Sequence, residues 1–400
     1  MLIWSSSGRG LGLLAAAALL AGCGGGGGNA AATASEPQTA SLSAQAALGE
    51  KIFNDVSLSA SGRQSCASCH AADRAHSPTN ALSVQLGGPL QDQQGRRSTP
   101  SIDYLSFNST FHFAADGTPT GGFFWDGRAA SLQAQAGGPF VNPFEMANAD
   151  VPAVVARLAR AAYVDEFKRV FGADILSRPS DAMGRMTLAL SQYQKEDAEF
   201  RPFSSKYDEF LRGKVALTEQ ELRGLALFNS PGKGNCQACH PSAKAADGSF
   251  PLFTDFSYDN LGVPRNPAIA RNADPAYFDL GLCERPDLAA RKDLCGAFKV
   301  PSLRNVAQRQ VFFHNGRFTS LKEALTFYVQ RDTHPEKWYP LNADGSVRKF
   351  DDLPAAYAGN VNTTEAPYNR KPGDAPALSD AEIDDVITFL RTLSDGYTPR

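Results

Sequence analysis

Two short stretches of this chain carry the residue types and spacing of a covalent haem site. Residues 66–70 read Cys-Ala-Ser-Cys-His, and residues 236–240 read Cys-Gln-Ala-Cys-His. In this motif two cysteines bind a porphyrin through thioethers, and the histidine supplies an axial ligand to the iron. One copy alone also fits a zinc site or a redox dithiol, but the repetition favours two haem c groups. The predicted attachment residues are Cys66, Cys69 and His70 for the first haem and Cys236, Cys239 and His240 for the second.

The composition fits a globular protein and gives no sign of a nucleic-acid partner. The 400 residues leave room for two domains of ordinary size, and 42% of them are apolar, which suffices for hydrophobic cores. The formal net charge is only -3. Because a nucleic-acid-binding face is normally basic, we expect no such partner.

The beginning of the chain predicts export rather than a folded element. Arg9 precedes an apolar run over residues 11–21 that is too short to span a bilayer as a settled helix. Cys23 follows Leu-Ala-Gly, the pattern of a bacterial lipoprotein processing site. We therefore predict a signal peptide over residues 1–22, an acylated Cys23 and a membrane anchor on the periplasmic side; a plain secretory signal is the alternative. Residues 24–43 are rich in Gly, Ala, Ser and Thr, which is typical of a flexible linker.

The two cysteines outside these motifs are Cys283 and Cys295, which enclose a short polar segment. In an oxidising compartment such a pair is expected to form a disulfide, with two free thiols as the alternative. Haem c attachment, which bacteria carry out outside the cytoplasm, points to the same compartment.

An internal repeat positions the two haem motifs. We predict short amphipathic helices over residues 44–54 and 219–229, each followed by a loop and a motif. Residues 49–54 (Gly-Glu-Lys-Ile-Phe-Asn) match residues 224–229 (Gly-Leu-Ala-Leu-Phe-Asn). The repeat predicts a mainly α fold of two cytochrome c-like haem domains in tandem, with long ordered loops. The predicted domains are residues 44–215 and 216–400.

Further helices are expected over residues 151–172, from residue 181 to about residue 196, and over residues 320–330. A last helix begins with the capping pattern Ser-Asp-Ala-Glu at residues 379–382, and we expect it to pack on the first helix of its own module. Strand signals are few and short. Residues 85–148 are rich in Gly, Pro, Asn and aromatics, so we expect a loop-dominated segment that carries function.

Together with the haem motifs, four other segments resemble the bacterial di-haem cytochrome c peroxidase/MauG superfamily. They are residues 122–128 (Gly-Phe-Phe-Trp-Asp-Gly-Arg), 138–146 (Gly-Pro-Phe-Val-Asn-Pro-Phe-Glu-Met), 300–306 (Val-Pro-Ser-Leu-Arg-Asn-Val) and 313–316 (Phe-His-Asn-Gly). The resemblance extends from about Ser43 to the C-terminus. It implies an oxidoreductase whose N-terminal, peroxidatic haem reacts with hydrogen peroxide and whose C-terminal haem transfers electrons.

The resemblance assigns three residues to the chemistry. Cleavage of the O–O bond of peroxide needs a proton moved between its two oxygens, and a partly buried carboxylate can move it. The family places that carboxylate at Glu145 and a peroxide-orienting amide at Gln135. Trp125 matches the tryptophan between the two haems, where an oxidisable indole can relay electrons. The structural alternatives are a solvated glutamate, an ordinary helix glutamine and a tryptophan that packs in the core.

The sixth ligand of the second haem separates branches of the family. Ordinary peroxidases of the family have a methionine fourteen residues after the histidine of the Phe-His-Asn-Gly motif, and none of the four methionines here follows the second haem motif. Position 328 holds Tyr328, whose phenolate would favour the higher oxidation states of iron. This substitution resembles the MauG/MbnH-like branch, which implies that a tryptophan of a partner protein is the substrate. A core tyrosine is the alternative.

Two further expectations concern metal sites. Many family peroxidases have a histidine in the region of residues 86–100 that closes the first haem, and this chain has none there. We therefore predict an open, five-coordinate iron. His76 and His112 are residual candidates, both expected to be surface or loop residues, and His334 is expected in a loop. The family also implies a calcium ion held by the side chain at Ser98 and the backbone carbonyls of Arg309 and Val311. Asparagine is usual where this chain has Ser98; calcium accepts such mixed oxygen donors.

The leading hypothesis is an exported di-haem enzyme that uses hydrogen peroxide and oxidises a partner protein through long-range electron transfer. The first alternative is a cytochrome c peroxidase that detoxifies peroxide with electrons from a small redox protein. The second is a non-catalytic di-haem electron carrier, which predicts two six-coordinate haems.

Overall fold

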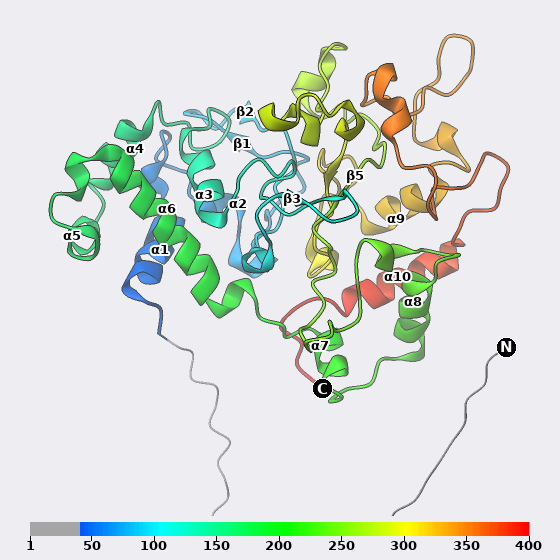
Figure 1. Ribbon diagram of the computed structural model, residues 1–400, viewed down its shortest axis with the longest axis horizontal. Coiled ribbons are helices and arrows are strands. Elements are labelled where there is room, and N and C mark those ends of the chain that lie inside the picture. Colours follow the sequence, from blue (N-terminus) through cyan, green and yellow to red (C-terminus); the bar gives the residue numbers. More distant parts are fainter. Residues whose placement is uncertain (1–40, 400) are drawn as a thin grey trace, which may run out of the picture. The chain divides into compact units, whose positions relative to one another are not determined.

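The computed structural model describes residues 41–399, which belong to one compact unit, drawn in Figure 1. The predicted signal peptide and Cys23 lie outside the described residues. The unit is mainly helical, as predicted. Its α-helices are α1 (Ala44–Asn54), α2 (Cys66–Cys69), α3 (Leu132–Val141), α4 (Val151–Leu158), α5 (Val164–Phe171), α6 (Pro179–Glu196), α7 (Lys206–Leu211), α8 (Glu219–Asn229), α9 (Leu321–Gln330) and α10 (Asp380–Arg391).

Strands are short and form three separate antiparallel pairs in the described chain. They are β1 (Leu86–Gly87) with β2 (Gln93–Gln94), β3 (His112–Phe113) with β4 (Pro119–Thr120), and β5 (Tyr258–Asp259) with β6 (Phe298–Lys299). The first two are local hairpins, whereas the third joins two segments that are distant in the sequence. Residues of this third pair line the same cavity as the second haem motif. The stretches without helix or strand are ordered loops that include short 3₁₀ turns.

The two helices that precede the haem motifs are each crossed by a later helix at a glycine. α1 packs against α6, and α8 packs against α10 (Figure 1). A Cβ atom at Gly49 would lie 2.1 Å from the carbonyl oxygen of Ala189, and one at Gly224 would lie 2.1 Å from that of Asp385. The contact between α8 and α10 confirms the predicted packing of the last helix, and the repeat places the same close crossing in both halves.

Two hydrophobic cores surround these crossings. The first is built from α1, α3, α4 and α6 and includes Phe53, Phe140 and Phe167. The second is built around α8, α9 and α10, and α7 adds Tyr207 to it. The cores contain separate stretches of sequence, but the domain boundary at residues 215/216 stays a prediction.

One helix prediction is wrong in detail. The helix expected over residues 151–172 is broken into α4 and α5 by turns at residues 159–163, where the Tyr163 hydroxyl donates to Asp55 Oδ2 at 2.7 Å. The break allows Ala161 and Phe167 both to enter the first core. The segment 85–148 is mostly loop, as predicted, and contains one longer helix, α3. Ser131 caps α3 by accepting a hydrogen bond from the Ala134 amide, and Leu132, Ala136 and Phe140 form a buried stripe.

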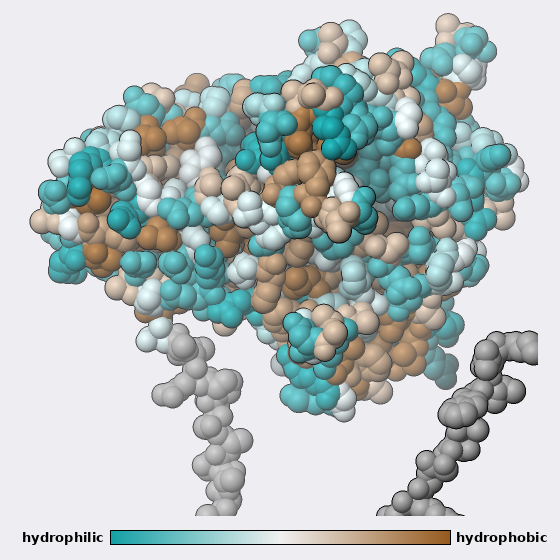
Figure 2. All heavy atoms as spheres, viewed as in Figure 1, coloured by the Kyte–Doolittle hydropathy of each residue, from teal (hydrophilic) through white to brown (hydrophobic). Residues whose placement is uncertain are grey.

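The described residues present both hydrophilic and apolar side chains on the surface. Figure 2 shows one face, on which hydrophilic residues predominate and apolar residues form smaller groups. Among the described residues no helix combines the length and the hydropathy needed to cross a membrane.

Candidate functional site

Both haem motifs adopt a tight turn that presents two cysteines and a histidine together. Cys66 and Cys69 lie one helical turn apart in α2, and the His70 amide donates to the Cys66 carbonyl at 2.9 Å. Cys236 begins a 3₁₀ turn, and the His240 amide donates to its carbonyl at 2.8 Å. The same backbone hydrogen bond therefore sets the spacing in both motifs.

Each motif histidine is held through one ring nitrogen, which leaves the other for a metal. The Nδ1 atom of His70 donates to the His76 carbonyl at 3.0 Å, and that of His240 donates to the Phe253 carbonyl at 2.7 Å. Burial lowers the pKa of His70 to about 4 and also lowers the pKa of His240. Two neutral imidazoles with free Nε2 atoms fit axial ligands to iron.

The zinc and dithiol alternatives are not supported. Burial raises the pKa of Cys66 to about 12, of Cys69 to about 11 and of Cys236 to about 12, which disfavours the thiolate that both alternatives require. In the described part of the chain, no three His, Cys, Asp or Glu side chains gather as a metal-binding group. Thioether attachment, which removes the thiol, fits these buried cysteines.

A cavity of about 270 Å³ adjoins the second motif and fits a flat, mostly apolar macrocycle. Cys236, Cys239 and His240 lie on its wall, together with the apolar side chains Phe228, Leu303 and Leu325. The cavity extends to Trp125 in the loop that precedes α3.

Tyr328 projects from α9 into the same cavity. Its ring lies 5.4 Å from that of Phe313 and 5.9 Å from that of Tyr368. Within residues 41–399 its hydroxyl makes no hydrogen bond, and burial raises its pKa. A metal cation bound to the hydroxyl would lower this raised pKa, so the phenol can act as a ligand. Tyr328 as the sixth ligand of the second haem stays a prediction.

Glu145 lies beside the first motif, because its charge contributes to the raised pKa of both Cys66 and Cys69, after burial. Burial also raises the pKa of Glu145, partly offset by the charge of Arg128 and by a hydrogen bond of 3.0 Å from Asn142 Nδ2 to Oε1. The backbone of Glu145 is fixed by the hairpin of β1 and β2, whose Gly88 amide donates to its carbonyl at 2.8 Å.

Gln135 is half-buried on α3, upstream of the loop that carries Glu145. Its side chain makes no hydrogen bond to another described residue. A side-chain amide without a hydrogen-bond partner is available to a ligand. That Gln135 orients peroxide stays a prediction.

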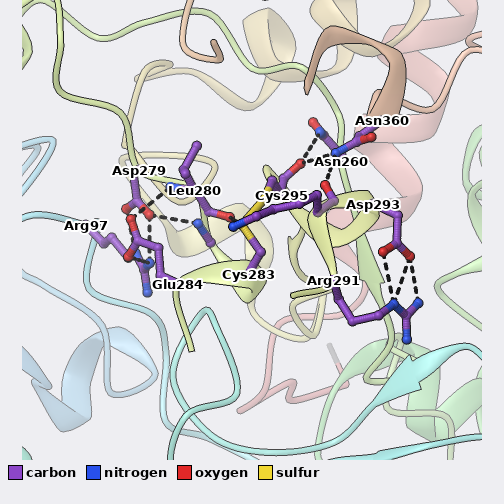
Figure 3. Close-up of a disulfide and its surroundings, with 12 residues drawn as sticks. Arg97, Asn260, Asp279, Leu280, Cys283, Glu284, Arg291, Asp293, Cys295 and Asn360 are labelled. Carbon is purple, nitrogen blue, oxygen red and sulfur yellow. Dashed lines mark hydrogen bonds and ion pairs between the residues drawn. A yellow bond between two sulfur atoms is a disulfide. The ribbon is translucent and has the colours of Figure 1, made fainter. Parts of the chain in front are cut away.

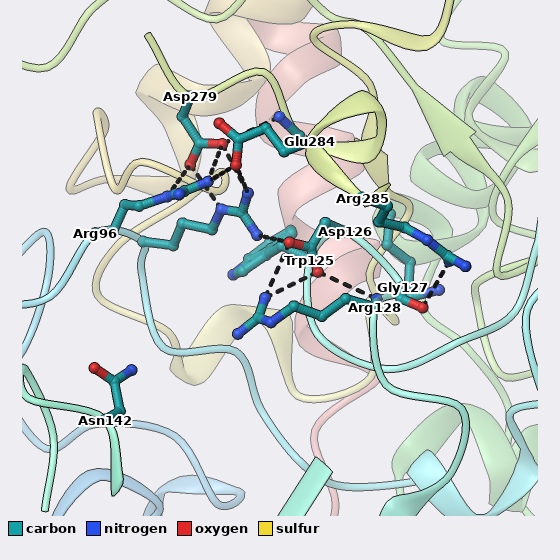
Figure 4. A network of polar contacts seen from close by, with 12 residues as sticks. Arg96, Trp125, Asp126, Gly127, Arg128, Asn142, Asp279, Glu284 and Arg285 are labelled. Atoms are coloured by element: carbon teal, nitrogen blue, oxygen red, sulfur yellow. Dashed lines mark hydrogen bonds and ion pairs between the residues drawn. The ribbon is translucent and has the colours of Figure 1, made fainter. Parts of the chain in front are cut away.

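Trp125 is held between loops from both halves of the chain. Its Nε1 atom donates to the Ser98 carbonyl at 2.7 Å, and its own carbonyl accepts from the Lys299 amide at 2.9 Å. Figure 4 shows its ring beside a network of buried ion pairs. The network consists of Arg97 with Asp126 and Asp279, Arg128 with Asp126, and Arg96 with Asp279 and Glu284.

Sequence reasoning missed this network, although the adjacent arginines 96 and 97 were a usable signal. Burial raises the pKa of Asp126, but the charges of Arg97 and Arg128 outweigh it and hold the pKa below its usual value. The carboxylates of Asp126 and Asp279 therefore remain charged next to Trp125. Lys299 was missed too; burial lowers its pKa to about 7, and its Nζ atom donates to Tyr258 Oη at 2.6 Å.

The other histidines occupy different surroundings. His76 lies in a turn, which agrees with the loop position that was one of its two expected settings, and its side chain is 1% exposed. Nδ1 pairs with Asp103 Oδ1 at 2.6 Å and the ring stacks on Phe200. His112 is exposed in β3, and His334 lies in a loop. Residues 86–100 form the hairpin of β1 and β2; the coordination of the first haem stays a prediction.

The residues implied for calcium include an unpartnered donor. Ser98 Oγ is buried without a hydrogen-bond partner, and within residues 41–399 the carbonyls of Arg309 and Val311 accept no hydrogen bond. All three oxygens are uncharged, and the guanidinium of Arg309 lies close by, with Nη2 donating to the Thr99 carbonyl at 3.1 Å. The donor set fits a weak calcium site at most.

Cys283 and Cys295 are joined by a disulfide with an S–S distance of 2.10 Å (Figure 3). Glu284, next to the first of them, pairs with Arg96, so the loop that the disulfide closes also carries part of the ion network. Asn260 Nδ2 and Asn360 Nδ2 both donate to the Cys295 carbonyl, at 3.2 Å and 3.1 Å.

Comparison with known proteins identifies the family of this chain. The family described as di-haem cytochrome c peroxidase matches residues 43–216. A methylamine utilization protein MauG from Paracoccus denitrificans is 37% identical over 368 residues, which are 89% of this chain and 90% of that protein. The chain belongs to the di-haem cytochrome c peroxidase/MauG family. The resemblance seen in the sequence motifs is thereby confirmed.

A peroxidase and a solved structure of this family extend the comparison. A cytochrome c551 peroxidase from Nitrosomonas europaea is 33% identical over 298 residues, 73% of this chain and 74% of that protein. The crystal structure of the dihaem peroxidase BthA from Burkholderia thailandensis matches with a TM-score of 0.81 and 41% identity, over 88% of this chain and 86% of that one. This protein is therefore a family oxidoreductase with two haem c groups, and its mainly α fold of cytochrome c type is confirmed.

Proposed function

We propose that this protein is a peroxide-dependent di-haem enzyme of the MauG-like branch, which oxidises its substrate at a distance through the second haem. The observation that carries the proposal is Tyr328, which α9 places in the cavity of Cys236, Cys239 and His240 with an unpartnered hydroxyl. By resemblance, a tyrosine at this position is the feature of that branch. Haem iron, when bound, supplies the redox chemistry with hydrogen peroxide.

Glu145 is proposed to move the proton that O–O cleavage requires. Its carboxylate takes a proton from the peroxide oxygen that it faces and returns it to the departing oxygen, which leaves as water. Asn142 orients Oε1, and burial keeps the pKa above the usual range, so the carboxyl can both accept and release a proton. Gln135 is proposed to hold peroxide by a hydrogen bond from its free amide.

Trp125 is proposed to carry electrons between the two halves of the site. It lies on the wall of the cavity that adjoins the second haem motif. It is fixed by Ser98 from the first half of the chain and by Lys299 from the second half. Asp126, the residue after Trp125, pairs with Arg97 and Arg128, and these ion pairs help to fix the loop that carries the indole.

The proposed substrate is a tryptophan of a partner protein, as the MauG-like branch implies. The relatives also include cytochrome c551 peroxidases, so peroxide detoxification with electrons from a small redox protein is the second candidate. A pure electron carrier would not need an unpaired glutamine and a buried carboxyl beside the first motif.

Two finer proposals accompany the function. Calcium is proposed to bind weakly at Ser98 and the carbonyls of Arg309 and Val311, on the evidence of the unpartnered Ser98 hydroxyl. Export with a lipid anchor at Cys23 is proposed from the sequence pattern around that cysteine.

The test is the addition of stoichiometric hydrogen peroxide to the ferric protein, followed by absorbance and near-infrared spectroscopy. We expect a long-lived doubly oxidised species with a near-infrared band from charge shared between the haems. Steady turnover with reduced cytochrome c, only after prior half-reduction, would favour the second candidate. A protein whose spectrum does not respond to peroxide would contradict both.

A further inference from the structure

We infer that Arg309 is the resident counter-cation for a propionate carboxylate of the haems, and that it lies between the two haem sites. The inference rests on haem being attached at both motifs. It does not depend on the substrate, on Tyr328 as a ligand or on calcium.

The guanidinium of Arg309 has only neutral partners. Nη1 donates to Ser77 Oγ at 3.2 Å and Nη2 donates to the Thr99 carbonyl at 3.1 Å, and no described carboxylate lies within ion-pair distance. Three other arginines whose side chains are at most 9% exposed are paired. Arg97 pairs with Asp126 and Asp279, Arg304 with Asp208, and Arg331 with Asp332.

Arg309 is placed where it can reach a cofactor. It lines the cavity that also holds His240 and Trp125. Its charge also acts on the imidazole of His70, which belongs to the first motif. A single cation thus faces the second haem site while it remains close to the first.

Two more polar atoms in this neighbourhood have no partner. Ser98 Oγ and His76 Nε2 are both buried without a hydrogen bond. Arg309 donates hydrogen bonds to Ser77 and Thr99. These two residues directly follow His76 and Ser98 in the sequence. The guanidinium of Arg309 and the hydroxyl of Ser98 are both donors, and together they point to an anionic group with several acceptor oxygens.

The chemistry of the missing anion is that of a carboxylate carried by the cofactor. A guanidinium does not lose its proton in proteins, so burial without an anion is destabilising. A carboxylate accepts two parallel N–H bonds from the fork of an arginine. Haems attached at the two motifs would supply propionate carboxylates, whereas no carboxylate of residues 41–399 pairs with Arg309.

A fixed positive charge at this position favours the reduced iron and so raises the midpoint potential of the haem that it contacts. Replacing Arg309 with glutamine removes the charge but keeps a hydrogen-bond donor. Replacing it with lysine keeps the charge but loses the fork. The matched control is Arg169→Gln, which removes an exposed arginine of α5 that has no ion pair among the described residues.

The experiment is a spectroelectrochemical titration of the haem-loaded proteins, after haem content has been measured. We expect Arg309→Gln to lower one midpoint potential by about 59 mV or more, which is a tenfold change in a one-electron equilibrium. Arg309→Lys and Arg169→Gln should stay near the wild type. The haem whose potential falls identifies the source of the carboxylate.

Potentials in Arg309→Gln that match those of Arg169→Gln would overturn the inference. If Arg309→Gln fails to load haem, resonance Raman spectra of Arg309→Lys decide instead: a shifted propionate bending band supports the contact, and an unshifted band excludes it. Incomplete haem content in the wild-type protein would count against the two-haem assignment itself. Peroxide reactivity is not a readout, so a failed substrate proposal leaves this test intact.

Discussion

Glu145 has surroundings that raise the pKa of its carboxyl group. It is partly buried, its pKa is raised by that burial, and Asn142 fixes one of its oxygens. A carboxylate that acts first as a base must be ionised at the start of the reaction. Below its raised pKa the base form is lost, so the rate of reaction with peroxide should fall as the pH is lowered through that pKa.

Replacing Glu145 with glutamine should slow the reaction with peroxide by about 10²- to 10⁴-fold, because the amide can accept the hydrogen bond from Asn142 but cannot take a proton. Stopped-flow absorbance measures the rate, and the pH dependence above should vanish in the variant. Glu219→Gln, an exposed substitution on α8, is the control. Equal rates in the two variants would remove Glu145 from the mechanism.

Tyr328 can be tested by the loss of one atom. In Tyr328→Phe the ring still packs against Phe313 and Tyr368, so the fold should be kept while the oxygen donor is gone. We expect the low-spin ferric spectrum of the second haem to change and that of the first to persist, as seen by electron paramagnetic resonance. An unaltered spectrum would show that another residue provides the sixth ligand.

Among the elements, the two crossings at Gly49 and Gly224 determine how closely the helices approach. A methyl group at Gly224 would meet the Asp385 carbonyl at 2.1 Å, so α8 and α10 would have to separate. We expect Gly224→Ala to lower the free energy of unfolding by about 1–3 kcal/mol. Urea denaturation followed by far-ultraviolet circular dichroism measures the change.

Gly184→Ala is the matched control for this prediction. Gly184 lies within α6, and a Cβ atom there meets nothing within 4 Å. Alanine has the higher helix propensity, so this variant should gain about 1 kcal/mol. Equal effects at the two glycines would mean that the crossing does not limit the packing.

The helices that the sequence predicted well are those whose signals are local. α1 and α8 begin and end where periodicity and capping residues place them. The break between α4 and α5 depends on the contact of Tyr163 with Asp55, more than a hundred residues away, and no local pattern reveals it. The haem motifs were readable for the same local reason, whereas the partners of Trp125 and the burial of His76 come from the tertiary fold.

At the scale of the whole molecule, buried ion pairs are among the contacts that join distant stretches of sequence. Arg97 is 9% exposed and binds Asp279, 182 residues away in the sequence, at 2.6 Å. The same arginine pairs with Asp126, which follows Trp125. The position of the indole is therefore tied to an ion pair between remote parts of the chain.

Arg97→Gln should destabilise the protein by about 3–5 kcal/mol, because it leaves two buried carboxylates without their main cation. The double variant Arg97→Gln/Asp279→Asn should recover part of this loss. Thermal unfolding of the two single variants and the double variant gives the coupling energy. Strictly additive losses would show that the pair contributes nothing beyond its separate side chains.

The hydrogen bond from Trp125 to the Ser98 carbonyl has a consequence for how charge crosses the protein. A peptide oxygen accepts a hydrogen bond but is too weak a base to take the proton away. An indole oxidised in this position would remain a radical cation instead of becoming a neutral radical. Transfer through it should then proceed at the same rate in heavy water as in ordinary water.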